Sequence, residues 1–128
     1  MSHLRDEGSI LTVTPPPVLT DDVVTSILRD LEGCLMRGSS YALIFDLSQS
    51  GSPNPLQRAT LAAHMRKNKP RIERSVRAMA VVAPSPIVRG VLTAIFWLEP
   101  PPVKHQVFAN DSDARAWARW QINPKMRP

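Results

Sequence analysis

The sequence predicts a single α/β domain in which helices pack on a mixed or parallel sheet. Short apolar segments with strand character alternate along the chain with segments whose apolar residues recur at helical spacing. Prolines gather between these segments, where a missing N–H does least harm. The length of 128 residues suits one domain with an ordinary core. We therefore expect four or five strands flanked by about four helices.

The composition excludes several broad classes of protein. Hydrophobic residues make up 43% and charged residues 21%, which is neither a disordered nor a fibrous composition. The single cysteine, Cys34, can form neither a disulfide nor a cysteine-based metal site within one chain. The first eight residues lack the apolar run of a signal peptide, and no stretch approaches the roughly 18 apolar residues that span a bilayer. We expect a cytoplasmic protein, one domain over 1–128, with frayed ends at 1–8 and 123–128.

The first elements follow from turn and cap residues. Residues 9–13 are β-branched and apolar, and Glu7-Gly8 before them suits a hairpin turn from an earlier short strand. Thr20 is a good N-cap for a helix over about 21–36, whose apolar residues share one face. Gly38 suits its C-terminal stop.

The middle of the chain predicts a central strand and a proline-interrupted helix. Residues 41–47 are almost continuously apolar, as in a strand covered on both faces. Asn54 and Pro55 suit the start of a second helix. Pro70 should kink or break that helix, because it cannot donate to the carbonyl of Arg66, with one further turn through Ile72.

The last part predicts a strand, a helix, an edge strand and a final helix. The strands are expected at 77–82 and 104–109, and Asn110 with Asp111 should cap the final helix, with Ala114, Trp117 and Ala118 facing inward. The helix between the strands should start near Pro86 and end before Pro100. Its buried stripe is predicted to be Ile87, Val88, Val91, Leu92, Ile95 and Phe96.

Basic residues dominate the end of the second predicted helix. Net charge is +5, which favours an anionic partner without establishing one. If the helix continues past Pro70, five basic residues share one arc, opposite Leu61, Met65, Asn68 and Ile72. These five residues, the basic arc, are Arg66, Lys67, Arg71, Arg74 and Arg77. The arc could bind a nucleic acid, a lipid headgroup or a phosphate, or it could be a solvated face.

Residues that could support catalysis are scattered. His64 lies on the second predicted helix and His105 in the last strand, and no pair of histidines has metal-binding spacing. There is no glycine-rich phosphate loop and no nucleophile motif. We therefore expect no enzyme, no metal and no cofactor, with both histidines in packed or surface positions. An enzyme would need His64, His105 or Ser48 to converge with an acid such as Asp46.

Two further features could serve binding. Trp97 and Leu98 end the third predicted helix beside three prolines, where an exposed ring could anchor a protein partner or a second copy of the chain, although a core position is the ordinary alternative. Ser48, Ser50 and Ser52 lie in the loop after the central strand, next to a helix N-terminus. Ligands bind at such positions in open α/β sheets, so these serines are candidate phosphorylation sites.

Several motifs resemble the STAS/SEC14-like, SpoIIAA-like class of small bacterial proteins over about residues 10–122. They are residues 41–48, residues 85–97, and the run 100–102 followed by Val107-Phe108 and the helix at 114–117. The resemblance implies a STAS-like domain that acts through protein contacts as a regulatory or scaffolding module.

The resemblance does not extend to the best-known switch of this class. Anti-sigma factor antagonists carry an Asp-Ser-Ser-Gly type motif at the start of the second helix, but residues 52–56 stand in its place here. A SEC14-type lipid pocket would need a longer chain. The sequence thus predicts a protein-contact module, with binding of an anionic ligand through the basic second helix as the alternative.

Overall fold

A computed structural model describes residues 3–126, without the side chains of Leu98 and Met126. Five strands form one sheet in the order β1-β2-β3-β4-β5. Strand β1 pairs antiparallel with β2, and the other neighbours are parallel, which confirms the predicted α/β class and mixed sheet. The strands are β1 (Leu4–Asp6), β2 (Ile10–Val13), β3 (Tyr41–Asp46), β4 (Val76–Val82) and β5 (His105–Phe108).

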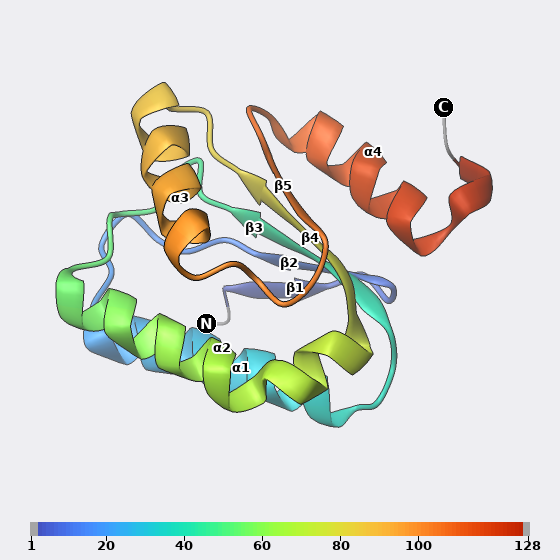
Figure 1. The fold of residues 1–128 in the computed structure, drawn as a ribbon, viewed down its shortest axis with the longest axis horizontal. Helices are drawn as coiled ribbons and strands as arrows, with labels where there is room; N and C mark the ends of the chain where they lie inside the picture. Colours follow the sequence, from blue (N-terminus) through green and yellow to red (C-terminus); the bar gives the residue numbers. More distant parts are fainter. Residues whose placement is uncertain (1–2, 127–128) are drawn as a thin grey trace.

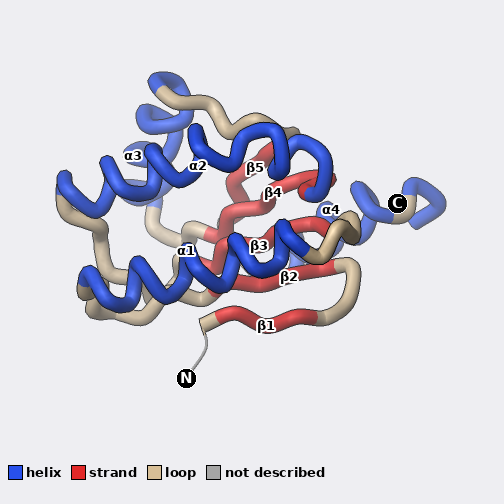
Figure 2. Tube along the Cα trace, turned by 90° about the horizontal axis from the view of Figure 1, so that it is seen from below, coloured by secondary structure: helices blue, strands red, loops and turns tan. Residues whose placement is uncertain are grey.

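The four helices are α1 (Asp21–Met36), α2 (Pro55–Ser75), α3 (Pro86–Leu98) and α4 (Asp111–Ile122), followed by a 3-10 turn at Pro124–Met126. Helices α1, α2 and α3 connect successive parallel strands in one direction across the sheet. Connections of one hand therefore bring all three helices to the same face. Helix α4 follows the edge strand β5 and covers the opposite face, as Figures 1 and 2 show. No helix in the described part of the chain is long and apolar enough to cross a membrane.

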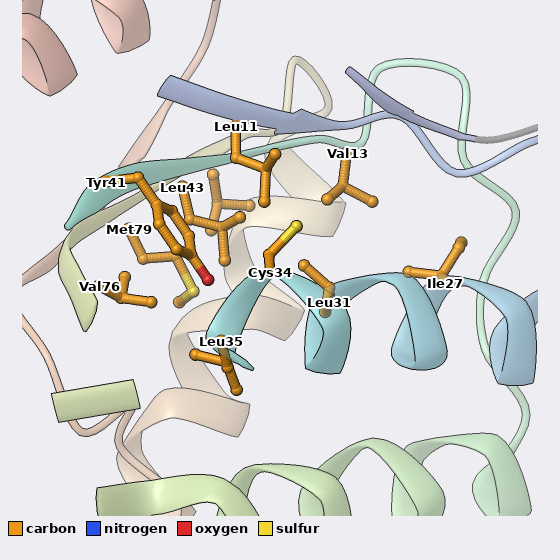
Figure 3. Packing of buried hydrophobic residues seen from close by; sticks show 11 residues of the cluster. Leu11, Val13, Ile27, Leu31, Cys34, Leu35, Tyr41, Leu43, Val76 and Met79 are labelled. Carbon is orange, nitrogen blue, oxygen red and sulfur yellow. The ribbon is translucent and has the colours of Figure 1, made fainter. Parts of the chain in front are cut away.

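The larger core lies between the sheet and α1. Its side chains come from one face of the strands and the inner face of α1, and Figure 3 shows the two sets meeting. Its fully buried members are Leu11, Val13, Ile27, Leu31, Cys34, Leu35, Tyr41, Leu43, Val76, Met79 and Val81. Burying each of the larger aliphatic side chains contributes about 1.5–3 kcal/mol, so this layer is the main source of stability.

The second core, under α4, uses smaller side chains. Ala114 and Ala118 lie fully buried against Ala42 and Ala80 of the sheet. Trp117 packs beside Phe108 at the margin, with ring centroids 5.6 Å apart. The inward positions predicted for α4 are confirmed, and the alanines allow the helix to approach the strands closely.

Helix starts agree with the sequence, whereas a break of the second helix at Pro70, one of the two predicted effects of this proline, is wrong. Thr20 and Asn54 accept hydrogen bonds from backbone N–H groups of α1 and α2 as N-caps. Helix α2 runs unbroken through Pro70 to Ser75. Pro70 is exposed, while Asn68 before it is buried in the contact with α1 and Ser75 after it is also buried, so packing on both sides of the proline holds the helix together.

Short regular elements occur within both segments that were expected to be frayed ends. Residues 4–6 form β1, whose Leu4 lies opposite Val13 of β2. The turn at Glu7-Gly8 has the predicted hairpin role, with Gly8 at φ 82°. Near the other end, residues 124–126 form a 3-10 turn. Among the described residues of 1–8 and 123–128, regular structure is thus limited to residues 4–6 and 124–126.

Candidate interaction surface

Helix α3 is rich in apolar residues and only loosely covered by the rest of the chain. Among its 13 residues, Arg89 alone is charged. Leu92 and Phe96 contact the larger core from its margin and are partly buried. No α3 side chain that the structure describes is fully buried. Such a helix exposes apolar surface wherever the sheet does not cover it.

One side of α3 presents a row of apolar residues to solvent. We call this row the α3 stripe, and it consists of Ile87, Gly90, Val91, Ala94 and Trp97. Ile87 is 79% exposed, Val91 52% and Trp97 86%. Trp97 thus has the exposed position that the contact hypothesis requires and not the core position that is the ordinary expectation, while the side chain of Leu98 lies outside the described residues. Single exposed apolar side chains are ordinary, but a row on one helix face is typical of an interaction surface.

The predicted burial of Ile87 and Val91 is wrong. Both residues lie on the side of α3 away from the sheet, whereas Val88, Leu92, Ile95 and Phe96 are partly buried as predicted. Arg89 and Thr93, one turn apart, are the only side chains of α3 with charged or hydroxyl groups, so the polar side of the helix is narrow. The sequence signals for the α3 stripe were therefore this narrow polar side and a glycine in the helix interior.

The only charge on α3 is kept away from the α3 stripe. One guanidinium nitrogen of Arg89, Nη1, donates to the carbonyl oxygens of Ala83 and Pro84, each at 2.9 Å. Ser85 caps the helix by accepting from the N–H of Val88. These contacts satisfy the polar groups at the start of α3 locally. The α3 stripe is consequently an uncharged surface.

The basic arc is divided by its surroundings. Arg66 pairs with Glu99 at 3.4 Å and Lys67 pairs with Glu32 at 3.6 Å. Arg71 and Arg74 are exposed on α2 and contact no carboxylate among the described residues. Arg77 lies in β4 rather than on the helix, although it is also exposed. Only four of the five predicted members therefore share α2.

An open groove lies between α2 and the proline-rich segment 99–104. Its volume is about 630 Å³, and Arg66, Lys69 and Lys104 line it together with Glu73 and Glu99. The three cations and two carboxylates largely offset one another. The groove lacks the concentrated positive charge that selective capture of an anion needs.

The histidines have separate neighbours. His64 lies between α1 and α2, with Nδ1 3.6 Å from a carboxylate oxygen of Glu32 and 3.4 Å from the amide nitrogen of Asn68. Burial lowers the pKa of His64, and the charge of Glu32 opposes that shift. His105 instead packs edge-on against Phe96, with centroids 5.2 Å apart. No group of three potential metal ligands occurs within residues 3–126.

The candidate loop serines differ in exposure. Ser48 and Ser52 are exposed, and the N–H of Ser48 donates to Oδ1 of Asp46 at 3.0 Å. Ser50 is partly buried and its hydroxyl donates to the carbonyl of Gly51. The loop rests on the segment after β2, where a Cβ added at Gly51 would lie 2.1 Å from the carbonyl oxygen of Pro17. This close approach requires glycine.

No protein-family model matches the chain, and a search of curated proteins finds no significant match.

Proposed function

We propose that this chain is a non-enzymatic regulatory or scaffolding module that acts through protein contacts made by the α3 stripe. The exposure of Ile87, Val91 and Trp97 on one uncharged helix face carries the proposal. Trp is favoured at the centres of interfaces because its large ring buries much apolar area. The STAS-like, bacterial and cytoplasmic assignments belong to the same proposal and rest on the sequence motifs, while the α/β class is compatible with them.

The proposal predicts that a double variant of the stripe loses association while keeping its fold. Ile87→Ser and Trp97→Ala together remove two exposed side chains, so the folded state should lose little stability. We expect association, measured by light scattering and chemical crosslinking, to weaken by at least tenfold, because interface residues of this kind contribute about 1.4 kcal/mol or more.

Val18→Ser is the matched control for this experiment. Val18 is 71% exposed but lies in the segment between β2 and α1, outside α3. Association that persists in the folded double variant, or that is lost equally in the control, would contradict a role for the α3 stripe.

A second candidate function is binding of an anionic ligand by the basic arc. Arg71 and Arg74 favour it, since both are exposed without a carboxylate partner in the described chain. Arg71→Glu with Arg74→Glu should abolish binding to duplex DNA and to phosphatidylglycerol vesicles, and binding by the unaltered chain should weaken steeply with salt. Binding that survives the reversal would leave the basic arc as a solvated face.

A further inference from the structure

Gly90 has no evident role within a single chain. It lies in the middle of α3, and a Cβ added there would meet nothing within 4 Å. Its φ is outside the positive region, which in the described chain only Gly8 and Gly38 occupy among the glycines. Glycine inside a helix costs about 1 kcal/mol relative to alanine. Neither backbone strain nor intramolecular packing explains this residue.

Gly90 and Trp97 form a complementary pair of surface features. They are seven residues apart, which is about two helical turns or about 10 Å, so both project from the same side of α3. Both are exposed. The α3 stripe therefore carries a large protruding ring and, two turns before it, a position without a side chain.

We propose that the partner of the α3 stripe is a second copy of this chain, a proposal that rests on the function proposed above. Two α3 helices pack antiparallel around a two-fold axis that passes between Thr93 and Ala94. Trp97 of each chain then covers Gly90 of the partner subunit. A two-fold contact uses the same patch on both copies. One Trp97 ring and one open position at Gly90 on each helix therefore form the two equivalent halves of the contact.

The local charge distribution suits contact with an uncharged surface, such as the α3 stripe of a second copy, better than contact with a charged one. Each chain has a net charge of +5, so two copies repel one another, and this repulsion is smallest where the contact itself brings no like charges together. The α3 stripe is such a surface, because Arg89 is bound to the carbonyls of Ala83 and Pro84. An acidic partner would find no cation on the α3 stripe to pair with.

The available area predicts a moderate rather than a permanent dimer. Helix α3 is about 20 Å long, and one face of it supplies only part of the roughly 800 Å² that each partner buries in a standard interface. We therefore expect monomer and dimer to exchange as protein concentration changes.

Gly90→Leu separates the effects on fold and on association. Within one chain the new side chain enters open space and favours the helix, so the melting temperature of the monomer should rise. In the dimer it occupies the space needed by the partner's Trp97, so sedimentation equilibrium should show at least a tenfold weaker dimer. A structural role for Gly90 inside the monomer would instead lower the melting temperature.

Gly33→Leu is the matched control. Gly33 is also exposed inside a helix, α1, with nothing within 4 Å of an added Cβ. It should give a similar gain in melting temperature without weakening the dimer. Equal loss of the dimer in both variants would overturn the proposed contact.

A single engineered cysteine tests the position of the axis. Ala94→Cys places a thiol next to the proposed two-fold, where oxidation should link two chains efficiently. Ala116→Cys, exposed on α4, should not crosslink at the same concentration. The natural Cys34 is buried and should not compete. Equal crosslinking of the two variants would contradict the antiparallel α3 contact.

The outcomes separate the dimer from the broader proposed function. A monomeric wild-type chain that nevertheless binds another protein at fixed stoichiometry, with loss on Trp97→Ala, overturns the second copy and leaves the contact module. A monomeric chain that binds no other protein through Trp97 overturns both the dimer and the proposed contact function. A dimer that is unaffected by Gly90→Leu and Trp97→Ala places the interface elsewhere and also overturns both.

Discussion

At the scale of single residues, the contact between α1 and α2 depends on a small polar cluster. Asn68 is 1% exposed, and its amide nitrogen donates to Glu32 at 3.2 Å and to the carbonyl of His64 at 3.1 Å. Lys67 reaches the same carboxylate. Glu32 thus joins three α2 side chains to α1. Buried polar groups are tolerated only when they are bonded in this way.

This cluster predicts that acidification weakens the fold. Burial is the largest influence on His64 and lowers its pKa, so the unfolded chain binds a proton more readily than the folded chain. The free energy of unfolding should therefore fall as the pH drops from about 6.5, the ordinary pKa of histidine, to the lowered pKa in the fold. Urea denaturation at a series of pH values measures this slope.

Two variants assign the slope to His64. His64→Leu should flatten it, because the new side chain does not titrate and suits the apolar surroundings of Leu31, Phe45 and Met79. Glu32→Gln should steepen it, since the carboxylate charge raises the pKa of His64. An unchanged slope in His64→Leu would assign the pH dependence to other groups.

At the scale of elements, Pro70 is a defect inside an otherwise continuous helix. It lacks the N–H that would bond to the carbonyl of Arg66, and proline is the least favourable residue in a helix interior. Pro70→Ala should therefore raise the free energy of unfolding by about 1–2 kcal/mol, less than the full helix penalty because proline also restricts the unfolded chain. Urea denaturation gives the value.

The exposed position of Pro70 makes this test clean. The substitution removes no packed side chain. Lys69→Ala, at the adjacent exposed position, should change stability by no more than about 0.5 kcal/mol. A loss of stability in Pro70→Ala would mean that the proline geometry is needed for the last turn of α2 and the entry into β4.

The same elements show which parts of the fold the sequence could predict. Helix α1 has its bounds predicted correctly because Thr20 begins it and Gly38 ends it, and its apolar residues lie on one face. The path of α2 beyond Pro70 depends on tertiary contacts, including Asn68 with Glu32, which no local pattern records. Local signals therefore predicted the starts of helices better than their continuation.

The candidate site was predictable in part for a related reason. Trp97 was a contact candidate because it ends a helix beside three prolines, and it is indeed exposed. Ile87 and Val91 were assigned to the core, since apolar character alone does not distinguish a core from an interface. The significance of Gly90 required the three-dimensional finding that its side-chain position is open.

At the scale of the whole molecule, helices cover the two faces of the sheet to different extents. Helix α4 covers its face with Ala114 and Ala118 packed tightly on the strands. On the other face, α1 is firmly packed, while α3 has only its inner side partly buried. A second chain over α3 would complete this layer, so folding and association should be coupled.

That coupling predicts a melting temperature that rises with protein concentration. A dimer binds only the folded state, so mass action stabilises it, and each tenfold increase in concentration above the dissociation constant adds about 1.4 kcal/mol per dimer. Calorimetry over two decades of concentration should reveal an upward trend for the unaltered chain. Gly90→Leu should begin at a higher melting temperature at low concentration, and its upward trend should set in only at concentrations at least tenfold higher than for the unaltered chain. Gly33→Leu should also begin higher, and its trend should set in at the same concentration as that of the unaltered chain. A melting temperature that is independent of concentration in all three proteins would mean that no second copy of the chain packs on the exposed side of α3.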